Sequence, residues 1–164
     1  MTTTSQTAMP LPGLPNLFHA IASSILAGKS QLRQAKPRIL VIDNERAICE
    51  LLLLYLGEMN FEVATARSAH EARALLQRGQ FDLVILEWML DGVQALDLLH
   101  LSKTYHPEVP VILFTAEDVD DASLAGRLAR KADAVVPKLG PLDALSKTIF
   151  RILDQRQGQP LKAA

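Results

Sequence analysis

Apolar residues follow two patterns along this chain, and the patterns alternate from residue 38 onward. Continuous aliphatic runs such as ILVI and LVIL are typical of strands buried on both faces of a parallel sheet. Between them, apolar residues recur at helical spacing. The patterns predict strands at 38–42, 61–66, 82–87, 109–115 and 132–137, and helices at 45–59, 68–79, 93–105, 120–131 and 141–155.

Five strands and five helices in one-to-one alternation predict an α/β fold with a doubly wound parallel sheet. Each strand pair needs a right-handed crossover, so helices cover both faces of the sheet. Two helix ends carry clear signals. Ser68 precedes the second helix as a cap, and Gly79 closes it.

The chain divides by composition into three parts. Residues 1–36 are rich in Thr, Ser and Pro and then predict one short amphipathic helix, on the apolar positions Leu14, Leu17, Phe18, Ile21 and Ile25. The polar face of this helix has almost no charge, which favours docking on the main domain or on a partner helix over a membrane surface. Residues 37–155 form the main domain, and residues 156–164 form a polar tail that we expect to be frayed.

The composition of the chain argues against several classes of function. With 164 residues, of which 49% are hydrophobic, the chain can build one compact domain with a real core. The net charge is -1 and the basic residues are scattered, which argues against nucleic-acid binding. No apolar run approaches the roughly 20 residues that cross a bilayer, so we expect a cytoplasmic protein without membrane insertion. The lone Cys49 excludes an intramolecular disulfide and a multi-cysteine metal site.

Polar side chains follow the predicted strands directly. In open α/β sheets the functional crevice lies outside the carboxyl ends of the strands, so these side chains should converge. They are Asp43, Asn44 and Glu45 after the first strand, Glu87 after the third, Thr115 after the fourth, and Lys138 after the fifth. Acids, a hydroxyl and an ammonium at one edge could hold a divalent cation and organise phosphoryl chemistry.

At these positions the sequence resembles the receiver domains of two-component response regulators. The resemblance rests on ILVIDNERAICELL, FDLVILEWML, VPVILFTA and ADAVVPK, and it covers about residues 37–155. It implies a flavodoxin-like (βα)5 sheet with strand order 2-1-3-4-5. It also implies that an aspartate after the third strand attacks a phosphoryl donor, that the first-strand acids bind Mg²⁺, and that Thr115 and Lys138 contact the phosphoryl group.

Two positions depart from the family pattern. Asp43 matches the first acid, but Asn44 stands in place of the second, and Glu87 stands in place of the nucleophilic aspartate. The metal pocket that the resemblance implies therefore comprises Asp43, Asn44, Glu87 and the backbone of Met89. The neutral oxygen of Asn44 should weaken Mg²⁺ binding. No other cofactor is implied.

Both departures point away from phosphotransfer. Glutamate is one methylene longer than aspartate, so the Glu87 carboxylate should reach toward Lys138 and the space that a phosphoryl group would fill. In-line transfer depends on positioning, which makes Glu87 a poor nucleophile. Our hypothesis is an atypical, non-enzymatic receiver that acts in phosphorelay signalling as a protein-interaction module, with Glu87 as a built-in anion that biases it toward an active-like state.

Other interpretations stay open. A different acid, Asp91 or Asp43, could accept the phosphoryl group, although the Asp-Gly pair at 91–92 favours a turn. A small-ligand-binding flavodoxin-like domain is a further alternative, but no glycine-rich loop follows the first strand. A hydrolase is disfavoured, because Cys49 has no suitable partner pattern.

The expected partners are other signalling proteins, either a histidine kinase or a downstream effector. A homodimer is a further expectation, formed through the N-terminal helix or through the face of the fourth helix, fifth strand and fifth helix. In the last helix, an apolar stripe should face inward and leave Phe150 at the edge, as an exposed anchor or as simple packing; the stripe is Leu142, Leu145, Ile149, Ile152 and Leu153.

Overall fold

The computed structural model describes residues 36–90, 93–116, 126 and 130–157. The chain separates into two units, Met1–Ala35 and Lys36–Ala164, and the fold below is that of the second. The amphipathic helix predicted near the N-terminus, Asp91 and most of the helix predicted at 120–131 lie outside the described residues.

Five parallel strands form the central sheet, in the order β2-β1-β3-β6-β7. The strands are β1 (Arg38–Ile42), β2 (Glu62–Ala66), β3 (Leu83–Leu86), β6 (Val111–Thr115) and β7 (Ala134–Pro137). The order is the predicted 2-1-3-4-5, and the flavodoxin-like fold class is confirmed. All five strands run the same way, so their carboxyl ends meet at one edge.

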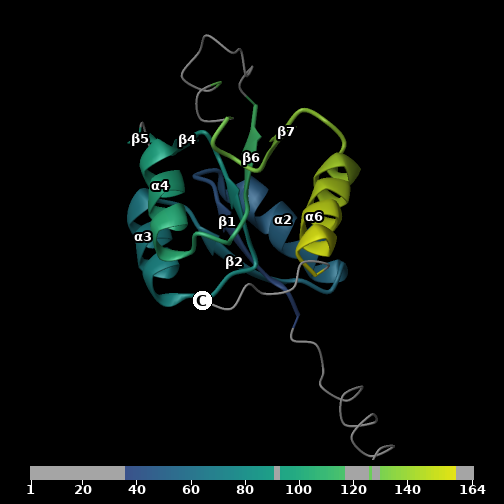
Figure 1. The fold of residues 1–164 in the computed structure, drawn as a ribbon. Coiled ribbons are helices and arrows are strands. Elements are labelled where there is room, and N and C mark those ends of the chain that lie inside the picture. The colour runs from purple at the N-terminus through teal and green to yellow at the C-terminus, as the bar shows by residue number, and fades with distance from the viewer. Residues whose placement is uncertain (1–35, 91–92, 117–125, 127–129, 158–164) are drawn as a thin grey trace, which may run out of the picture. The chain divides into compact units, whose positions relative to one another are not determined.

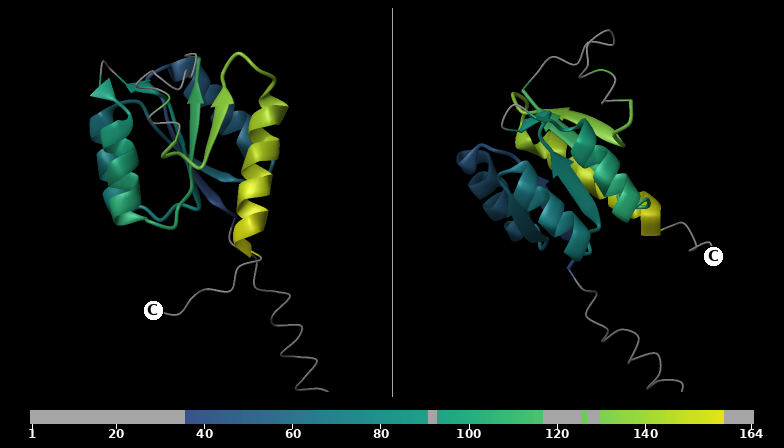
Figure 2. Two further views of the ribbon diagram at one scale, coloured as in Figure 1. Left: turned by 45° about the horizontal axis from the view of Figure 1, so that its top comes forward. Right: turned by 90° about the vertical axis from the view of Figure 1, so that its left-hand side faces the viewer.

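Four described helices cover the two faces of this sheet (Figures 1 and 2). Helices α2 (Arg46–Glu58) and α6 (Leu142–Gln157) pack on one face, and α3 (Ala69–Arg78) and α4 (Leu96–Tyr105) pack on the other. Residues within a strand alternate between the two cores: Ile39 and Val41 face α2 and α6, whereas Leu40 and Ile42 face the other pair. A strand buried on both faces explains the unbroken aliphatic runs.

The predicted cap of helix α3 is present. Ser68 Oγ accepts a hydrogen bond from the Glu71 backbone N–H at 3.2 Å, and Glu71 Oε2 accepts one from the Arg67 N–H at 2.7 Å. Gly79 ends the helix with an extended backbone, at φ -93°. A side chain there would clash, because an added Cβ would lie 2.5 Å from the Phe81 ring. Close packing, rather than a left-handed turn, therefore requires this glycine.

The predicted helix at 93–105 begins later than expected. Residues before it form a short antiparallel pair, β4 (Met89–Leu90) and β5 (Val93–Gln94). The Ala95 N–H donates to the Trp88 carbonyl at 3.0 Å and closes this hairpin, which takes the first residues away from the helix. The extra pairing follows Glu87 immediately, so it fixes the chain next to the strand edge.

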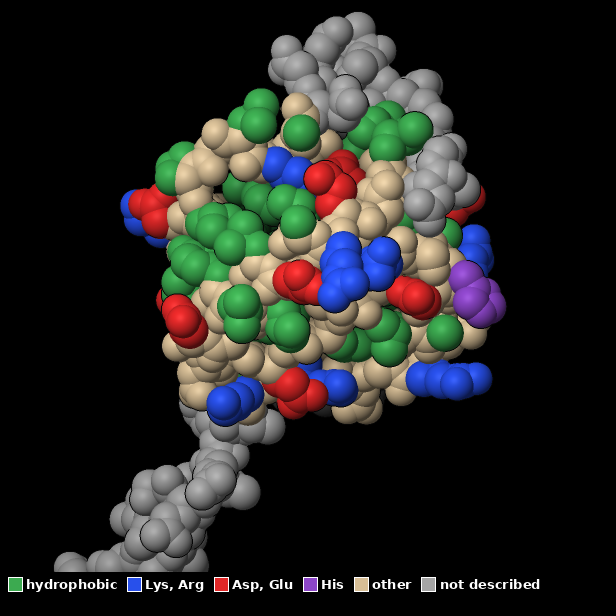
Figure 3. Space-filling model, turned by 180° about the vertical axis from the view of Figure 1, so that it is seen from behind, with side chains coloured by type: hydrophobic (Ala, Val, Ile, Leu, Met, Phe, Trp, Pro, Cys, Tyr) green, Lys and Arg blue, Asp and Glu red, His purple; other side chains and the backbone are tan. Residues whose placement is uncertain are grey.

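Hydrophobic side chains gather in several groups among charged ones on the face seen in Figure 3. On helix α2 the exposed apolar residues are Leu51, Leu53 and Leu54. The predicted inward stripe of α6 packs into the core, and Phe150 is 45% exposed while its ring lies 5.5 Å from that of Phe61. Among the described residues, no helix combines the length and apolar character needed to cross a bilayer.

Candidate functional site

Asp43 is the first polar residue after strand β1, and it is buried, with 2% of its surface exposed. Its backbone N–H continues the sheet by donating to the Ala66 carbonyl at 3.0 Å. Its Oδ1 accepts a hydrogen bond from the Glu45 N–H at 2.9 Å, and its carbonyl accepts one from the buried Cys49 thiol at 3.2 Å. These hydrogen bonds hold both the backbone and the side chain of Asp43, so they fix the orientation of its carboxylate.

Glu87 follows strand β3 and is 8% exposed. Its backbone N–H donates to the Ile42 carbonyl at 2.9 Å, which extends the β1–β3 pairing to the glutamate. Each carboxylate oxygen has its own partner: Oε1 accepts a hydrogen bond from the Trp88 N–H, and Oε2 pairs with the Lys138 ammonium. The carboxylate is therefore held between the strand that carries it and the far end of β7.

Lys138 contacts the acids at the ends of β1 and β3. It follows β7, and its backbone N–H donates to the Thr115 carbonyl at 2.8 Å. Its side chain is 6% exposed, and its Nζ lies 2.8 Å from Asp43 Oδ2 and 2.9 Å from Glu45 Oε1, in addition to the contact with Glu87. One ammonium thus pairs with three carboxylates.

Burial and pairing act on the ionisation of this cluster. Burial raises the pKa of Asp43, while hydrogen bonding to Lys138 and to the Glu45 N–H works against that increase. Burial disfavours the Lys138 ammonium, but its hydrogen bonds to Asp43, Glu87 and Glu45 outweigh burial, and its pKa is raised. Lys138 therefore remains a cation throughout the physiological pH range.

The structure brings together four of the strand-end residues singled out in the sequence, because Lys138 contacts Asp43, Glu45 and Glu87. Thr115 is buried at the end of β6, where its carbonyl meets the Lys138 backbone. Asn44 is exposed, and Met89 is 40% exposed on β4.

Glu45 is the residue that sequence reasoning named at the strand end but left out of the pocket. Its backbone is extended, with φ -78° and ψ 110°. Asn44 forms a bend between Asp43 and Glu45, and both carboxylates contact Lys138. The apolar pattern of the strand carries no signal for a contact made after a bend.

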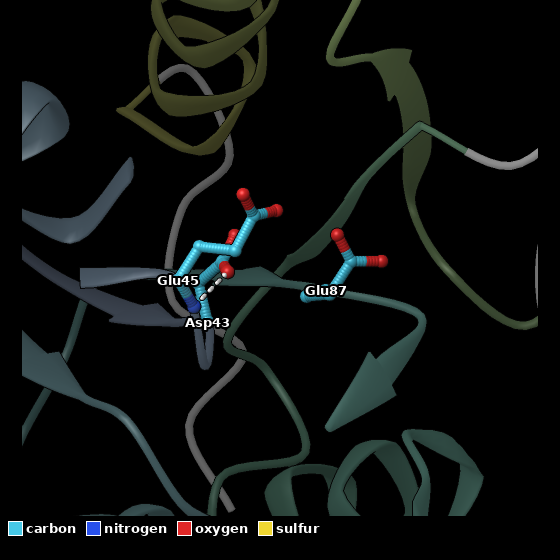
Figure 4. Close-up of side chains that lie close together, drawn as sticks. All are labelled: Asp43, Glu45 and Glu87. Carbon is cyan, nitrogen blue, oxygen red and sulfur yellow. Dashed lines mark hydrogen bonds between the residues drawn. The ribbon is translucent and has the colours of Figure 1, made fainter. Parts of the chain in front are cut away.

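The three acids also offer a ligand set for a hard cation. One oxygen from each of Asp43, Glu45 and Glu87 lies within 4.8 Å of the others, and Figure 4 shows the carboxylates gathered at the ends of β1 and β3. Oxygen ligands of this kind suit Mg²⁺ or Ca²⁺. The donor chemistry fits, but all three side chains already contact the Lys138 ammonium.

Comparison with known proteins gives consistent matches. Response regulator protein PilR of Pseudomonas aeruginosa is 33% identical over 120 residues, which cover 72% of this chain and 27% of that protein. The probable transcriptional regulatory protein TcrX of Mycobacterium tuberculosis is 33% identical over 97 residues, 59% of this chain and 42% of that protein. The chain spans about a quarter of the length of PilR and of the alginate regulators AlgB that it also matches.

Solved structures agree with the fold. Response regulator TrrA of Thermotoga maritima, in complex with Mg(2+)-BeF, superposes with a TM-score of 0.63 at 31% identity and covers 71% of this chain and 98% of its own. A receiver domain protein of Methanospirillum hungatei gives a TM-score of 0.67 at 26% identity, with coverage of 74% and 97%. The family model of the response regulator receiver domain matches residues 39–150. The chain therefore belongs to the response regulator receiver domain family, whose members work in two-component signalling.

Proposed function

We propose that this protein is an atypical receiver that is not phosphorylated at the usual position and that works as a protein-interaction module in phosphorelay signalling. Receiver domains are generally signalling modules rather than enzymes. Glu87, at the position of the phosphoacceptor, holds the site in an active-like arrangement. One negative carboxylate stands in for the phosphoryl group, which would carry about 1.5 to 2 charges and three acceptor oxygens.

The observation that carries this proposal is the engagement of both Glu87 oxygens. A nucleophile needs an oxygen that is directed at the phosphorus in line with the leaving group. Here Oε1 is held by the Trp88 N–H and Oε2 by Lys138, and the side chain is 9% exposed. An incoming phosphoryl donor would have to break one of these contacts. The same two contacts give Glu87 the backbone and ammonium partners that would suit a bound anion.

The residues available to bind a divalent cation also support the proposal that the usual position is not phosphorylated. Phosphoryl transfer of this kind relies on a divalent cation to neutralise developing charge. Asn44, in place of an acid, offers a neutral oxygen and is exposed. A bound Mg²⁺ would be held by Asp43, Glu45 and Glu87 and would supply charge neutralisation at the strand edge. We propose that Mg²⁺ binding is weakened relative to receivers with a full acidic pair.

The test is incubation with a small phosphodonor and Mg²⁺, followed by intact mass. The natural sequence should show no added phosphoryl group. The matched control is the double variant Glu87→Asp with Asn44→Asp, which restores the two missing acids and should gain one phosphoryl group per chain. A stoichiometric adduct on Glu87 in the unmodified protein would defeat the proposal.

A second reporter comes from the only tryptophan, Trp88. Its backbone contacts Glu87, so its emission should respond to an anion that enters the site. Beryllofluoride with Mg²⁺, the ligand in the TrrA complex, should leave the emission of the natural protein unchanged and should shift that of the double variant. An equal shift in both proteins would show that Glu87 does not fill the anion position.

The second candidate function is a receiver that is phosphorylated at another acid, Asp91 or Asp43. Asp43 is a poor one, because Oδ1 accepts the Glu45 N–H, Oδ2 pairs with Lys138, and the residue is 2% exposed. Asp91 lies outside the described residues. Peptide mapping after the phosphodonor reaction separates these acids from Glu87. Absorbance of a bound chromophore or nucleotide in the purified protein would instead favour a small-ligand binder.

Response regulators interact with histidine kinases and with downstream effectors, and we propose partners of these two kinds here. We also propose a homodimer. It would form through residues 1–36 or through the face that includes β7 and α6. On this second face Val135 of β7 is 37% exposed, whereas the ring of Phe150, which is 45% exposed, lies 5.5 Å from that of Phe61, the residue before β2. Solution mass of the chain with and without residues 1–36 distinguishes the two dimers.

A further inference from the structure

We propose that residues 14–25 of this chain form a helix that packs on the exposed apolar side of helix α2. We call this side the α2 face, and its residues are Leu51, Leu53, Leu54 and Gly57. The proposal does not depend on whether Glu87 accepts a phosphoryl group, so the two can fail separately. It would engage residues 1–36 within one chain and would leave the face of β7 and α6 for a homodimer.

Three leucines within four positions of α2 are exposed, at 44% for Leu51, 43% for Leu53 and 69% for Leu54. They are three of the eight large apolar side chains that are exposed in the described part of the chain. A single exposed leucine is ordinary on a soluble protein, whereas neighbouring ones are typical of a contact surface. Leu52 and Leu56 already attach α2 to the core, so the sheet does not account for the exposed leucines.

Gly57 lies one turn after Leu53 and Leu54 and leaves room for another helix beside them. Glycine is unfavourable within a helix relative to alanine. A Cβ added at this position would meet nothing within 4 Å, so packing among the described residues does not require a glycine. Glycine does allow another segment to approach the backbone closely. The α2 face therefore suits an apolar helix.

The N-terminal segment can reach the α2 face, because β1 begins close to the place where α2 ends. The Pro37 carbonyl accepts a hydrogen bond from the Glu62 N–H at 3.0 Å, and Glu62 comes four residues after the end of α2 at Glu58. Residues 26–36 can span up to about 36–40 Å when extended. The 13 residues of α2 are only about 20 Å long. The linker is therefore long enough for the predicted helix to lie along α2.

The predicted helix also needs an apolar surface. A helix of 12 residues is marginal in water by itself, and packing of its apolar side supplies most of its stability. Here the apolar side carries Leu17, Phe18, Ile21 and Ile25, and the polar side has almost no charge that could form ion pairs. An exposed row of leucines in the same chain meets this need.

Charge favours this occupant over a second copy of α2. Residues 1–36 contain no acid, and their basic residues Lys29, Arg33 and Lys36 all follow the predicted helix. The last turn of α2 has no basic residue, and the carboxyl end of a helix is itself partly negative. The basic linker would lie near this end. A second α2 offers Arg46 as its one basic residue, which already pairs with Glu50 at 2.6 Å.

The experiment measures how fast a cysteine at position 54 reacts with a maleimide in the full-length chain. A docked helix should slow the reaction of Leu54→Cys at least about tenfold, because a short linker gives a high effective concentration. Adding Leu17→Asp and Ile21→Asp should restore the fast reaction. Leu139→Cys, at a residue that is 88% exposed and outside α2, is the matched control and should react equally fast with and without the aspartates. Cys49 is buried and contributes a slow background.

Hydrogen exchange tests the same contact without a new thiol. Gly57→Gln fills the room on the α2 face and meets nothing in the described domain, so it should speed exchange at residues 17–25 while the core strands stay protected. Slow labelling of Leu54→Cys that does not depend on protein concentration supports the proposal. Equal labelling with and without the two aspartates overturns it. Slowing that grows with concentration, together with a dimer mass in solution, also overturns it, because the occupant is then a second copy.

Discussion

Replacement of Glu87 by glutamine should destabilise the protein much more than the same replacement at Glu45. The two Glu87 oxygens accept from the Trp88 N–H and from Lys138. Glutamine has one acceptor oxygen and one NH₂ donor, so one of these two donors would face another donor. Loss of a hydrogen bond to a charged group costs about 1.5–3 kcal/mol, and the buried position leaves little water to replace it.

Replacement of Glu45 by glutamine should cost much less stability. Its carboxylate pairs with the same ammonium, but its side chain is 61% exposed. Exposed ion pairs contribute about 0–1 kcal/mol, and Lys138 would keep both buried partners. The free energies of unfolding of the two variants should therefore differ by at least about 1 kcal/mol.

Urea denaturation followed by far-UV circular dichroism measures this difference on the whole fold, away from local effects on Trp88. With a slope of about 2 kcal/mol per M, Glu87→Gln should lower the urea midpoint by about 1 M, while Glu45→Gln should leave it nearly unchanged. Equal shifts would refute the reasoning. A stabilised Glu87→Gln variant would show that repulsion between Glu87 and Asp43 exceeds the attraction of Lys138.

Three further predictions address the core and the ionisation of the site. Leu52→Ala removes a fully buried side chain between α2 and the sheet and should lower the free energy of unfolding by about 2–5 kcal/mol in urea denaturation. Among the described residues, the Ser102 hydroxyl is the buried side-chain polar atom without a hydrogen-bond partner, so Ser102→Ala should raise that free energy by about 1 kcal/mol; a decrease would contradict this. In an NMR titration, Lys138→Gln should raise the pKa of Asp43 further, because Lys138 opposes the effect of burial. Because the pKa of Asp43 is raised on folding, the folded protein binds this proton more tightly between pH 3.8 and the raised value. The resulting contribution to stability is fully present below 3.8 and is lost as pH rises through the raised value.

Local patterns in the sequence were sufficient for most of the fold. The run ILVI predicted β1, and Ser68 and Gly79 marked the ends of α3 within a residue. Buried strands need apolar residues on both faces, and helix caps need particular side chains, so both leave their signal in neighbouring residues. The start of α4 was predicted too early, because the β4–β5 pairing is a contact between segments that periodicity does not report.

The candidate site was also predicted in part from the sequence, and the rest depends on the tertiary structure. The sequence by itself determined which polar groups stand at the strand ends, since each follows its own apolar run, and the parallel order of the strands brings Asp43, Glu87 and Lys138 to one edge. Only the tertiary structure decided that a single ammonium contacts all three acids and that Glu45 completes the set. The reason is that Lys138 lies 93 residues from Glu45 along the chain, so their contact depends on the sheet register and on side-chain direction. Neither quantity is encoded in the residues next to them.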